Sequence, residues 1–359
     1  MIRAAAAFCL GAISALLTAI AAGDREATSR AFGSWSRSVS VFLSSVFSFL
    51  PISIAELLLY ALILLSLITF VRAVVRIFRR RSARPLLSWL SGAALTASCL
   101  VFLFLTLWGL NYFATPLSDK SGVEEQSAQA LYETSVWLRD EMNSLAGQVP
   151  RNEDGICDAG GFGALAKDSM LGYDALAGRG GDFVAGLTPP KRTLFPATLI
   201  HFGISGIYIP FTGEAVVESE ATDSLLPFTL CHELAHRQGT APEDEANYYA
   251  FLACAAHPDA VFRYSGYHVA FIYCSNALGQ ADGDLYSRLM GEVSPLVYND
   301  FRAQGELRKK YEGPLRDFGE STNDTYLKAV GQEAGVRSYG LVVDLLIADY
   351  LGTAKGESR

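Results

Sequence analysis

A His-Glu-x-x-His motif is the part of this sequence whose residue types and spacing could do chemistry. His232 and His236 lie four residues apart, so on a helix both imidazoles would point to one side and could share a metal ion. Glu233 lies between them, where its carboxylate could take a proton from a water molecule activated at that ion. The pattern predicts Zn²⁺, which in catalytic sites takes three protein ligands and leaves one position open.

Two helices joined by a short turn are expected to position these side chains. Asp223-Ser224 offers an N-cap, and Pro227 suits the first turn of a helix that ends before Gly239. Thr240-Ala241-Pro242-Glu243 then has capping-box spacing for a second helix through about Ala256. So short a connection brings the end of the first helix beside the start of the second.

The third ligand is expected from the start of this second helix. Glu243 is the predicted ligand because the turn returns it toward His236, and Glu245 is the alternative because only one of the two can face the metal. A capping role would also account for Glu243 without zinc. Asn247 could orient His232 through a hydrogen bond or be an ordinary polar helix residue.

A zinc site of this kind that hydrolyses peptide bonds also needs a hydrogen-bond donor for the oxyanion of the tetrahedral intermediate. Tyr339 is the candidate catalytic residue for this role. Five further side chains are alternatives for it: Tyr326, Arg337, Tyr264, Tyr267 and His268.

Composition separates a basic, apolar head from an acidic body. Half of the 359 residues are hydrophobic, only 18% are charged, and the mean hydropathy is +0.24. The segment through Ser118 holds ten arginines, no lysine and three acids, which gives it a net charge of +7. Since the whole chain carries −8, residues 119–359 carry a net charge of −15. This division argues against nucleic-acid binding and predicts a membrane region at 1–118 that carries a domain at 119–359.

Three apolar stretches in the head are long enough to cross a bilayer, at about 4–23, 52–74 and 87–110, and only the second contains charged residues, Glu56 and Arg72. The first could instead be a cleaved signal peptide, since Ala21-Ala22-Gly23 offers a cleavage site. Residues 38–50 are expected in the interface or against the spans. Six arginines between the second and third spans mark that loop as cytoplasmic. We therefore expect a multi-pass protein of the cell membrane, with the lipid bilayer as a partner and the 119–359 domain outside the cytoplasm.

The body is expected to be mainly α with a small β element. Helical patterns cover 123–146, 162–178, 259–281, 284–309, 322–332 and 337–351, and Gly206–Phe211 alternates like a strand. The edge of such a strand could pair with an extended substrate. A disulfide among Cys157, Cys231, Cys254 and Cys274 is left open, as is the oligomeric state.

Several motifs resemble an uncharacterised bacterial family of membrane-anchored proteins that carry a domain of unknown function. They include Gly206–Glu214, Pro227–Thr229, Cys231–His236 and Glu243–Asn247, with further matches at Arg263–Tyr267, Asn323–Lys328 and Ser338–Gly340. His-Glu-x-x-His followed by Glu-x-x-Ala-Asn is also similar to gluzincin metallopeptidases. That resemblance implies a gluzincin-like (zincin) domain in which the first Glu of the second motif, here Glu243, is a zinc ligand. The gap between His236 and Glu243 is shorter than in many gluzincins.

The sequence hypothesis is therefore a membrane-anchored zinc peptidase. His232, His236 and Glu243 would bind Zn²⁺, and Glu233 would be general base and then proton donor. The alternative is a non-catalytic membrane sensor or assembly protein with a structural or vestigial zinc site. The substrate, a peptide or protein, cannot be read from the residues.

Overall fold

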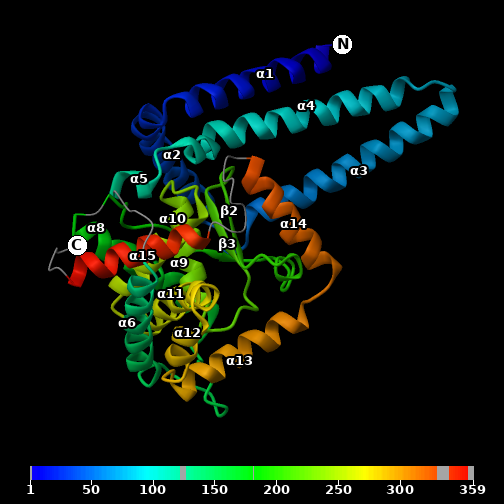
Figure 1. Cartoon of the computed structure of the whole chain (residues 1–359). Helices are drawn as coiled ribbons and strands as arrows, with labels where there is room; N and C mark the ends of the chain where they lie inside the picture. Colours follow the sequence, from blue (N-terminus) through cyan, green and yellow to red (C-terminus); the bar gives the residue numbers. More distant parts are fainter. Residues whose placement is uncertain (1, 122–126, 181, 330–338, 355–359) are drawn as a thin grey trace. The chain divides into compact units, whose positions relative to one another are not determined.

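The chain is mainly α-helical with a small three-stranded sheet, as the sequence predicts (Figure 1). The structure is a computed structural model that describes residues 2–121, 127–180, 182–329 and 339–354. The chain divides into two compact units, described separately below. The first unit is Met1–Thr115 with Ile209–Glu214, and the second is Pro116–Tyr208 with Ala215–Arg359.

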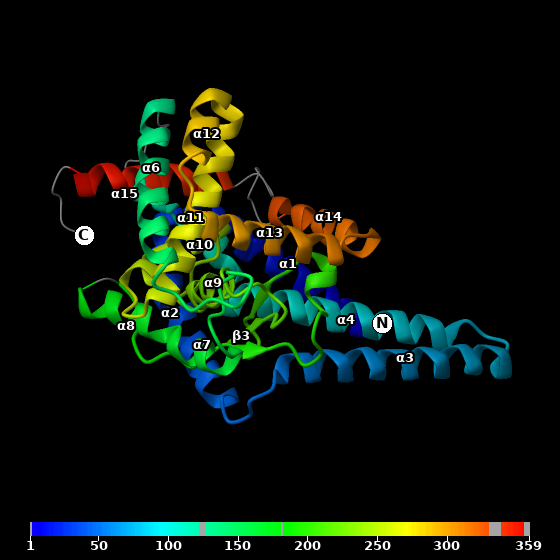
Figure 2. The ribbon, with the colours of Figure 1, turned by 90° about the horizontal axis from the view of Figure 1, so that it is seen from below.

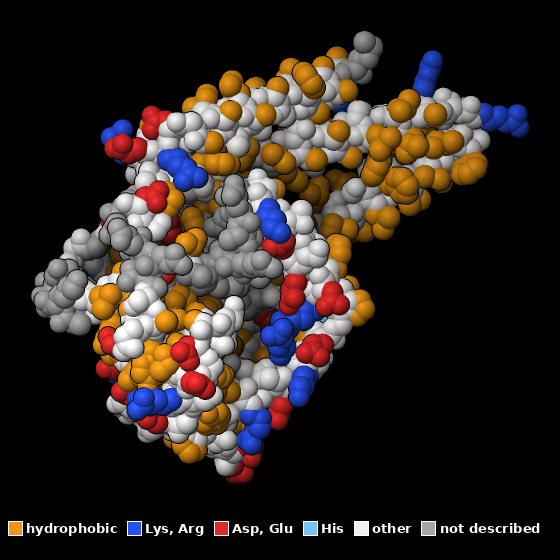
Figure 3. Space-filling model, viewed as in Figure 1, with side chains coloured by type: hydrophobic (Ala, Val, Ile, Leu, Met, Phe, Trp, Pro, Cys, Tyr) orange, Lys and Arg blue, Asp and Glu red, His pale blue; other side chains and the backbone are white. Residues whose placement is uncertain are grey.

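Three helices of the first unit are long and apolar enough to cross a membrane. They are α1 (Ile2–Gly23), α3 (Ile54–Arg80) and α4 (Arg84–Leu107). A rise of about 1.5 Å per residue makes each at least about 30 Å long, which matches a hydrocarbon core of about 30 Å. Their surfaces are covered by apolar side chains (orange in Figure 3). Helix α3 runs past its predicted end because the arginine-bearing stretch stays helical up to Arg81, whose φ of 46° ends it.

The segment at 38–50 packs against the neighbouring helices of the first unit, which is one of the two placements that the sequence predicts. Most of it belongs to α2 (Arg25–Phe47), a helix that begins at the Asp24 cap. One polar face of α2 is buried, since Ser36, Ser40 and Ser44 repeat at helical spacing. Ser36 Oγ donates to the Leu107 carbonyl at 3.0 Å, which fastens α2 to the end of α4 before η1 (Gly109–Phe113).

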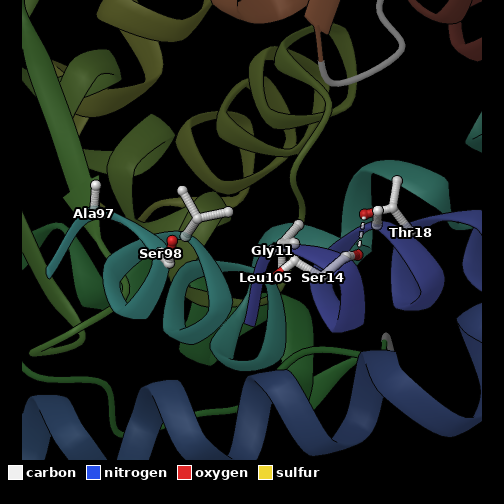
Figure 4. Close-up of a pocket in the computed structure, with 8 residues that line it drawn as sticks. Gly11, Ser14, Thr18, Ala97, Ser98 and Leu105 are labelled. Carbon is white, nitrogen blue, oxygen red and sulfur yellow. Dashed lines mark hydrogen bonds between the residues drawn. The ribbon is translucent and has the colours of Figure 1, made fainter. Parts of the chain in front are cut away.

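Small side chains mediate the packing of α1 along α4. Figure 4 shows the interface, where Gly11, Ser14 and Thr18 of α1 face Ala97, Ser98 and Leu105 of α4 around a cavity of about 420 Å³. Thr18 Oγ1 donates to the Ser14 carbonyl at 3.0 Å within α1. This hydroxyl therefore satisfies its hydrogen bond locally, as an apolar surrounding requires.

Glu214 caps the start of α3 inside the first unit. Its carboxylate accepts from the Ile54 N–H at 3.1 Å and the Ala55 N–H at 2.7 Å, and also from Thr212 Oγ1 at 2.9 Å. These are orphan donors of a helix N-terminus, where the helix dipole favours negative charge. Glu214 is only 2% exposed, so its charge is compensated by these bonds and not by water.

The second unit is mostly helical, and its long helix α11 (Ala260–Ala281) packs against five of the other helices, as Figure 2 shows from below. The helices of this unit besides α11 are α5 (Leu117–Ser121), α6 (Ala128–Ala146), α7 (Phe162–Asp168), α8 (Met170–Gly178), η2 (Ile200–Phe202), α9 (Leu226–Arg237), α10 (Glu243–Ala256), α12 (Gly283–Met290), α13 (Pro295–Lys310), α14 (Pro314–Ala329) and α15 (Tyr339–Ala354).

Two of the predicted helices are divided, and one begins earlier. The stretch 162–178 breaks between α7 and α8. The stretch 284–309 breaks between α12 and α13, because Ser294 caps a new helix that starts at Pro295. Helix α14 starts at Pro314 and not at 322. Both α13 and α14 begin with a proline, Pro295 and Pro314, and this sequence signal marks where the two helices start.

The sheet is formed by β1 (Lys191–Arg192), β2 (Gly206–Ile209) and β3 (Glu214–Val217), in the order β1-β3-β2. β1 is parallel to β3, with Lys191 opposite Val216. The predicted strand ends at Ile209 instead of Phe211, since Pro210 cannot donate to a ladder. Because β3 lies in the middle of the sheet, β2 is an edge strand.

The core of the second unit includes four buried cysteines. Cys157, Cys231, Cys254 and Cys274 are buried and, like Cys9 and Cys99, free. The disulfide that the sequence left open is therefore not present in this structure.

Candidate metal centre

Helix α9 carries the His-Glu-x-x-His motif through the core. Every residue of α9 is buried except His232. Pro227 lies in its first turn and Gly239 follows its end with φ of 94°, both as predicted. The predicted Asp223-Ser224 cap is wrong, because the residue before α9 is Leu225 and Asp223 instead accepts from the Ala159 N–H at 2.8 Å.

Helix α10 begins at Glu243, and this corrects the capping-box interpretation. Pro242 is the N-cap residue, in extended conformation, with no side-chain capping bond. Glu243 is therefore the first residue of the helix, not the third, and its carboxylate is free of a capping role. It points across the turn toward the two histidines.

His232, His236 and Glu243 form a cluster whose ligand atoms all lie within 4.8 Å of one another. The two Nε2 atoms are 3.1 Å apart. Glu243 Oε2 lies 3.3 Å from His232 Nε2, and Oε1 lies 3.6 Å from His236 Nε2. The structure thus brings together all three residues that the sequence predicts as ligands.

These separations suit a tetrahedral ion. Ligands at about 2.0–2.1 Å from zinc in a tetrahedron lie roughly 3.3 Å from each other. A hydrogen bond between the two histidines would account for the close approach of their Nε2 atoms only. A cation bound in the cluster would account for the positions of both nitrogens and of the Glu243 carboxylate. The donor set, two imidazoles and a carboxylate, is also one that catalytic zinc sites use. The residues therefore fit Zn²⁺.

The turn between the helices orients His236. Its Nδ1 lies 2.7 Å from the Thr240 carbonyl oxygen, which can only accept, so Nδ1 carries the proton and Nε2 presents its lone pair to the cluster. His232 Nδ1 is buried and has no hydrogen-bond partner among the described residues. Asn247 is buried, at 5% exposed, and no hydrogen bond joins it to His232 among the described residues, so its orienting role stays a prediction.

The electrostatics of the cluster favour a bound cation. Burial lowers the pKa of His236 to about 4, so this ring is neutral and able to bind metal at neutral pH. Burial also opposes the charged form of His232, but Glu243 outweighs it and raises the pKa of His232. Burial opposes ionisation of Glu243 as well, yet the two histidines lower its pKa to about 2. Glu243 is thus a carboxylate that needs a positive partner.

Glu233 is a buried carboxyl group beside the cluster. It is 3% exposed, and its Oε2 has no hydrogen-bond partner among the described residues. Burial raises its pKa to about 8, with the neighbouring charge of His232 opposing the shift. A carboxyl group with a pKa near neutrality is suited to proton transfer. A cation in the cluster would favour its ionised form.

Gly206 is a positioning residue that the sequence reasoning did not identify. A Cβ atom at this position would lie 2.5 Å from Glu233 Oε1, so β2 approaches the carboxyl group as closely as only glycine permits. A glycine inside an alternating strand is a sign of such an approach, and Gly206 opens β2. The edge strand and the Glu233 carboxyl group therefore approach each other closely.

Gly206→Ala is expected to turn the Glu233 side chain away without removing the metal ligands. Any peptide hydrolysis at this site should fall by about 100-fold, the effect of a misplacement of about 1 Å in an active site, while zinc content stays at the wild-type level. Ile207→Ala, at the adjacent and 41% exposed position, is the control and should retain most activity. Equal activity in Gly206→Ala and wild type would show that the contact does not position Glu233.

The metal-free protein should lose stability as pH rises, through Glu233. Its pKa is about 8 in the folded chain and 4.5 without the fold, so the folded state holds a proton that the unfolded state releases. Stability from this group is full below about pH 4.5 and is lost as pH rises through 8, by up to about 5 kcal/mol. Melting in chelator from pH 5 to 8 measures it. In the Glu233→Gln variant, the loss of stability between pH 5 and 8 should be smaller than in wild type. An equal loss in the two proteins would show that Glu233 is not the group responsible.

Glu245, the alternative third ligand, faces elsewhere. Its Oε1 accepts from the Leu117 N–H at 2.7 Å. Glu243 and Glu245 are two positions apart on one helix, about 200° around it, so they cannot both face α9.

The oxyanion donor predicted at Tyr339 lies outside the described side chains, as does Arg337; the backbone of Tyr339 begins α15. Three of the other candidates have partners elsewhere: Tyr264 and His268 are buried, and Tyr267 is partly buried. Tyr264 Oη donates to Asp300, which also pairs with Arg151, Tyr267 packs on Trp137 and Phe251, and His268 bonds to Gln304. Tyr326 is 38% exposed on α14.

Comparison with known proteins identifies the family of the chain. Residues 34–347 match the family described as "Protein of unknown function (DUF3810)". The chain belongs to this family. The matched range contains α3 and α4 together with all three residues of the metal cluster. No curated protein and no solved structure matches the chain. The suspected family is confirmed, and it brings no activity with it.

Proposed function

We propose that this protein is a membrane-anchored, zinc-dependent peptidase. The observation that carries the proposal is the juxtaposition at α9 and α10. Three groups able to bind zinc lie at tetrahedral spacing, and the buried carboxyl of Glu233 lies beside them. His232 and Glu243 have side chains 14% and 31% exposed, so the cluster can be reached from solvent.

The residues divide the chemistry among them. His232, His236 and Glu243 would hold the ion, which would supply Lewis-acid chemistry by lowering the pKa of a water molecule to about 7. Glu233 takes the proton from that water and passes it to the leaving amine. Thr240 holds His236 by its carbonyl oxygen, and Gly206 leaves room for the Glu233 carboxyl.

The edge strand β2 is the proposed binding place for an extended peptide. Its backbone is at the edge of the sheet, and Gly206 is in contact with Glu233. A substrate strand paired along β2 would therefore pass the catalytic carboxyl. Main-chain pairing selects an extended backbone and not a particular side chain.

An open site distinguishes a catalyst from a structural protein. A structural zinc site is closed by four protein ligands. The cluster found among the described residues contains three ligand groups, which leaves a position for water and substrate. This favours the peptidase over a sensor or assembly protein with structural zinc.

The charge pattern supports an extracytoplasmic active site. Six arginines and no acid lie between Glu56 and Asp119, and all six fall at or near the junction of α3 and α4. We propose that α1, α3 and α4 cross the membrane and that this junction is cytoplasmic. Because α4 is the last of these spans, a cytoplasmic junction before it places the second unit outside, whatever the number of spans that precede it.

A zinc-reconstitution assay tests the function. The purified full-length chain in detergent is incubated at neutral pH with a mixed peptide library, and new termini are identified by mass spectrometry. Cleavage should require zinc, stop with 1,10-phenanthroline and return on adding Zn²⁺. Intact peptides after incubation with the zinc-loaded chain would contradict the proposal.

A further inference from the structure

The first unit contains a large groove that the metal centre does not involve. It has a volume of about 1410 Å³ and is lined mainly by α3 and α4. Ordinary small-molecule pockets occupy about 300–1,000 Å³, so this groove suits a longer ligand. Its lining changes in character along its length. Leu62, Leu65 and Leu100 belong to the apolar part.

The other end of the groove is basic. Four arginines line it, Arg3 from α1, Arg76 and Arg80 from α3, and Arg84 from α4. A Cβ atom on Gly92 of α4 would lie 3.6 Å from Arg3 Nη1, so α1 adds a basic side chain about two turns along α4 from Arg84. No acidic residue occurs between Glu56 and Asp119 in the sequence, and no ion pair involves these four arginines in the described part of the chain. A bound anion would balance the positive charge of these four arginines.

The basic end lies at the depth where hydrocarbon gives way to headgroups. Arg76 follows the start of α3 by about 33 Å of helix, slightly more than a hydrocarbon core of about 30 Å. Trp89, which also lines the groove, is about one and a half turns into α4, as interfacial tryptophans commonly are. Figure 3 shows basic side chains (blue) where α3 and α4 meet, next to the apolar surface of both helices.

We infer that this groove binds an anionic diacyl phospholipid. The phosphate lies among Arg3, Arg76, Arg80 and Arg84, and the acyl chains lie along the leucines. Basic pockets between membrane helices recognise lipid headgroups in this way. The apolar length of the groove, which a free phosphate ion would leave uncovered, selects a lipid over inorganic phosphate.

Lipid retention by the purified full-length chain tests the site. The protein in mild detergent is mixed with phosphatidylglycerol or phosphatidylcholine, and bound lipid is counted by native mass spectrometry. Phosphatidylglycerol should be retained and phosphatidylcholine lost. Equal retention of the two would overturn the inference, as would displacement of phosphatidylglycerol by millimolar inorganic phosphate, which would assign the arginines to free phosphate.

The same loop supplies a matched control. Arg76→Gln/Arg80→Gln/Arg84→Gln removes three arginines that line the groove, and Arg72→Gln/Arg79→Gln/Arg81→Gln removes three equally exposed ones that do not. The first variant should lose about 100-fold in affinity for phosphatidylglycerol and the second no more than about fivefold, the effect of one basic residue near an anionic lipid. Equal losses would mean general charge attraction and overturn the site.

A second variant blocks the groove without changing its charge. Gly92→Leu places a side chain beside Arg3, where a Cβ atom meets no other atom within 4 Å. Phosphatidylglycerol retention should fall while helicity and elution volume stay at wild-type values. Unchanged retention would show that the lipid does not occupy this end of the groove.

Discussion

Glu233→Gln is expected to keep zinc and to lower peptide hydrolysis by about 10²–10⁴-fold, the range of general acid–base catalysis. Glutamine has nearly the shape of the glutamic acid side chain but cannot take a proton. The Glu233 carboxyl group is buried beside the three ligands and is not one of them, so the variant should bind zinc as the wild type does. Hydrolysis rates and zinc content are measured on the same preparation.

Glu245→Gln is the matched control for this variant. It makes the same change of acid to amide two residues after Glu243, on a side chain bonded to the Leu117 N–H. Its activity should stay near wild type. A Glu233→Gln protein that cleaves peptides at the wild-type rate would end the assignment of Glu233 as the base.

His236→Ala is expected to abolish zinc retention. Loss of an orienting partner alone weakens metal affinity by about 10–100-fold, so loss of a ligand should exceed about 100-fold. His236 is also the ring held by Thr240, and no other histidine is part of the cluster besides His232 in the described chain. Zinc per chain is measured by elemental mass spectrometry after dialysis against a weak chelator.

Two glutamate variants decide the third ligand in the same measurement. Glu243→Ala should behave like His236→Ala, and Glu245→Ala should retain zinc. Equal zinc in wild type and His236→Ala would remove the basis of the metal centre. Loss of zinc in Glu245→Ala with retention in Glu243→Ala would transfer the third ligand to Glu245.

The membrane helices and the histidine pair could be predicted because they depend on local pattern. A stretch of about 20 apolar residues has few alternatives to a membrane helix. Two histidines four apart share a helix face whatever surrounds that helix. Boundaries were less predictable. The predicted caps failed at α9 and α10, since the tertiary structure uses Asp223 to hold Ala159 and begins α10 directly after Pro242.

Helical periodicity alone is enough to predict that His232 and His236 can share an ion and that Glu233 lies beside them. The choice between Glu243 and Glu245 could not be made from residue spacing, because it depends on how the turn at Gly239 and Thr240 sets one helix against the other. The tertiary structure also brought Gly206 against Glu233 and four arginines from three helices to one groove. Contacts between residues far apart in the chain are fixed by packing, which local residue spacing does not encode.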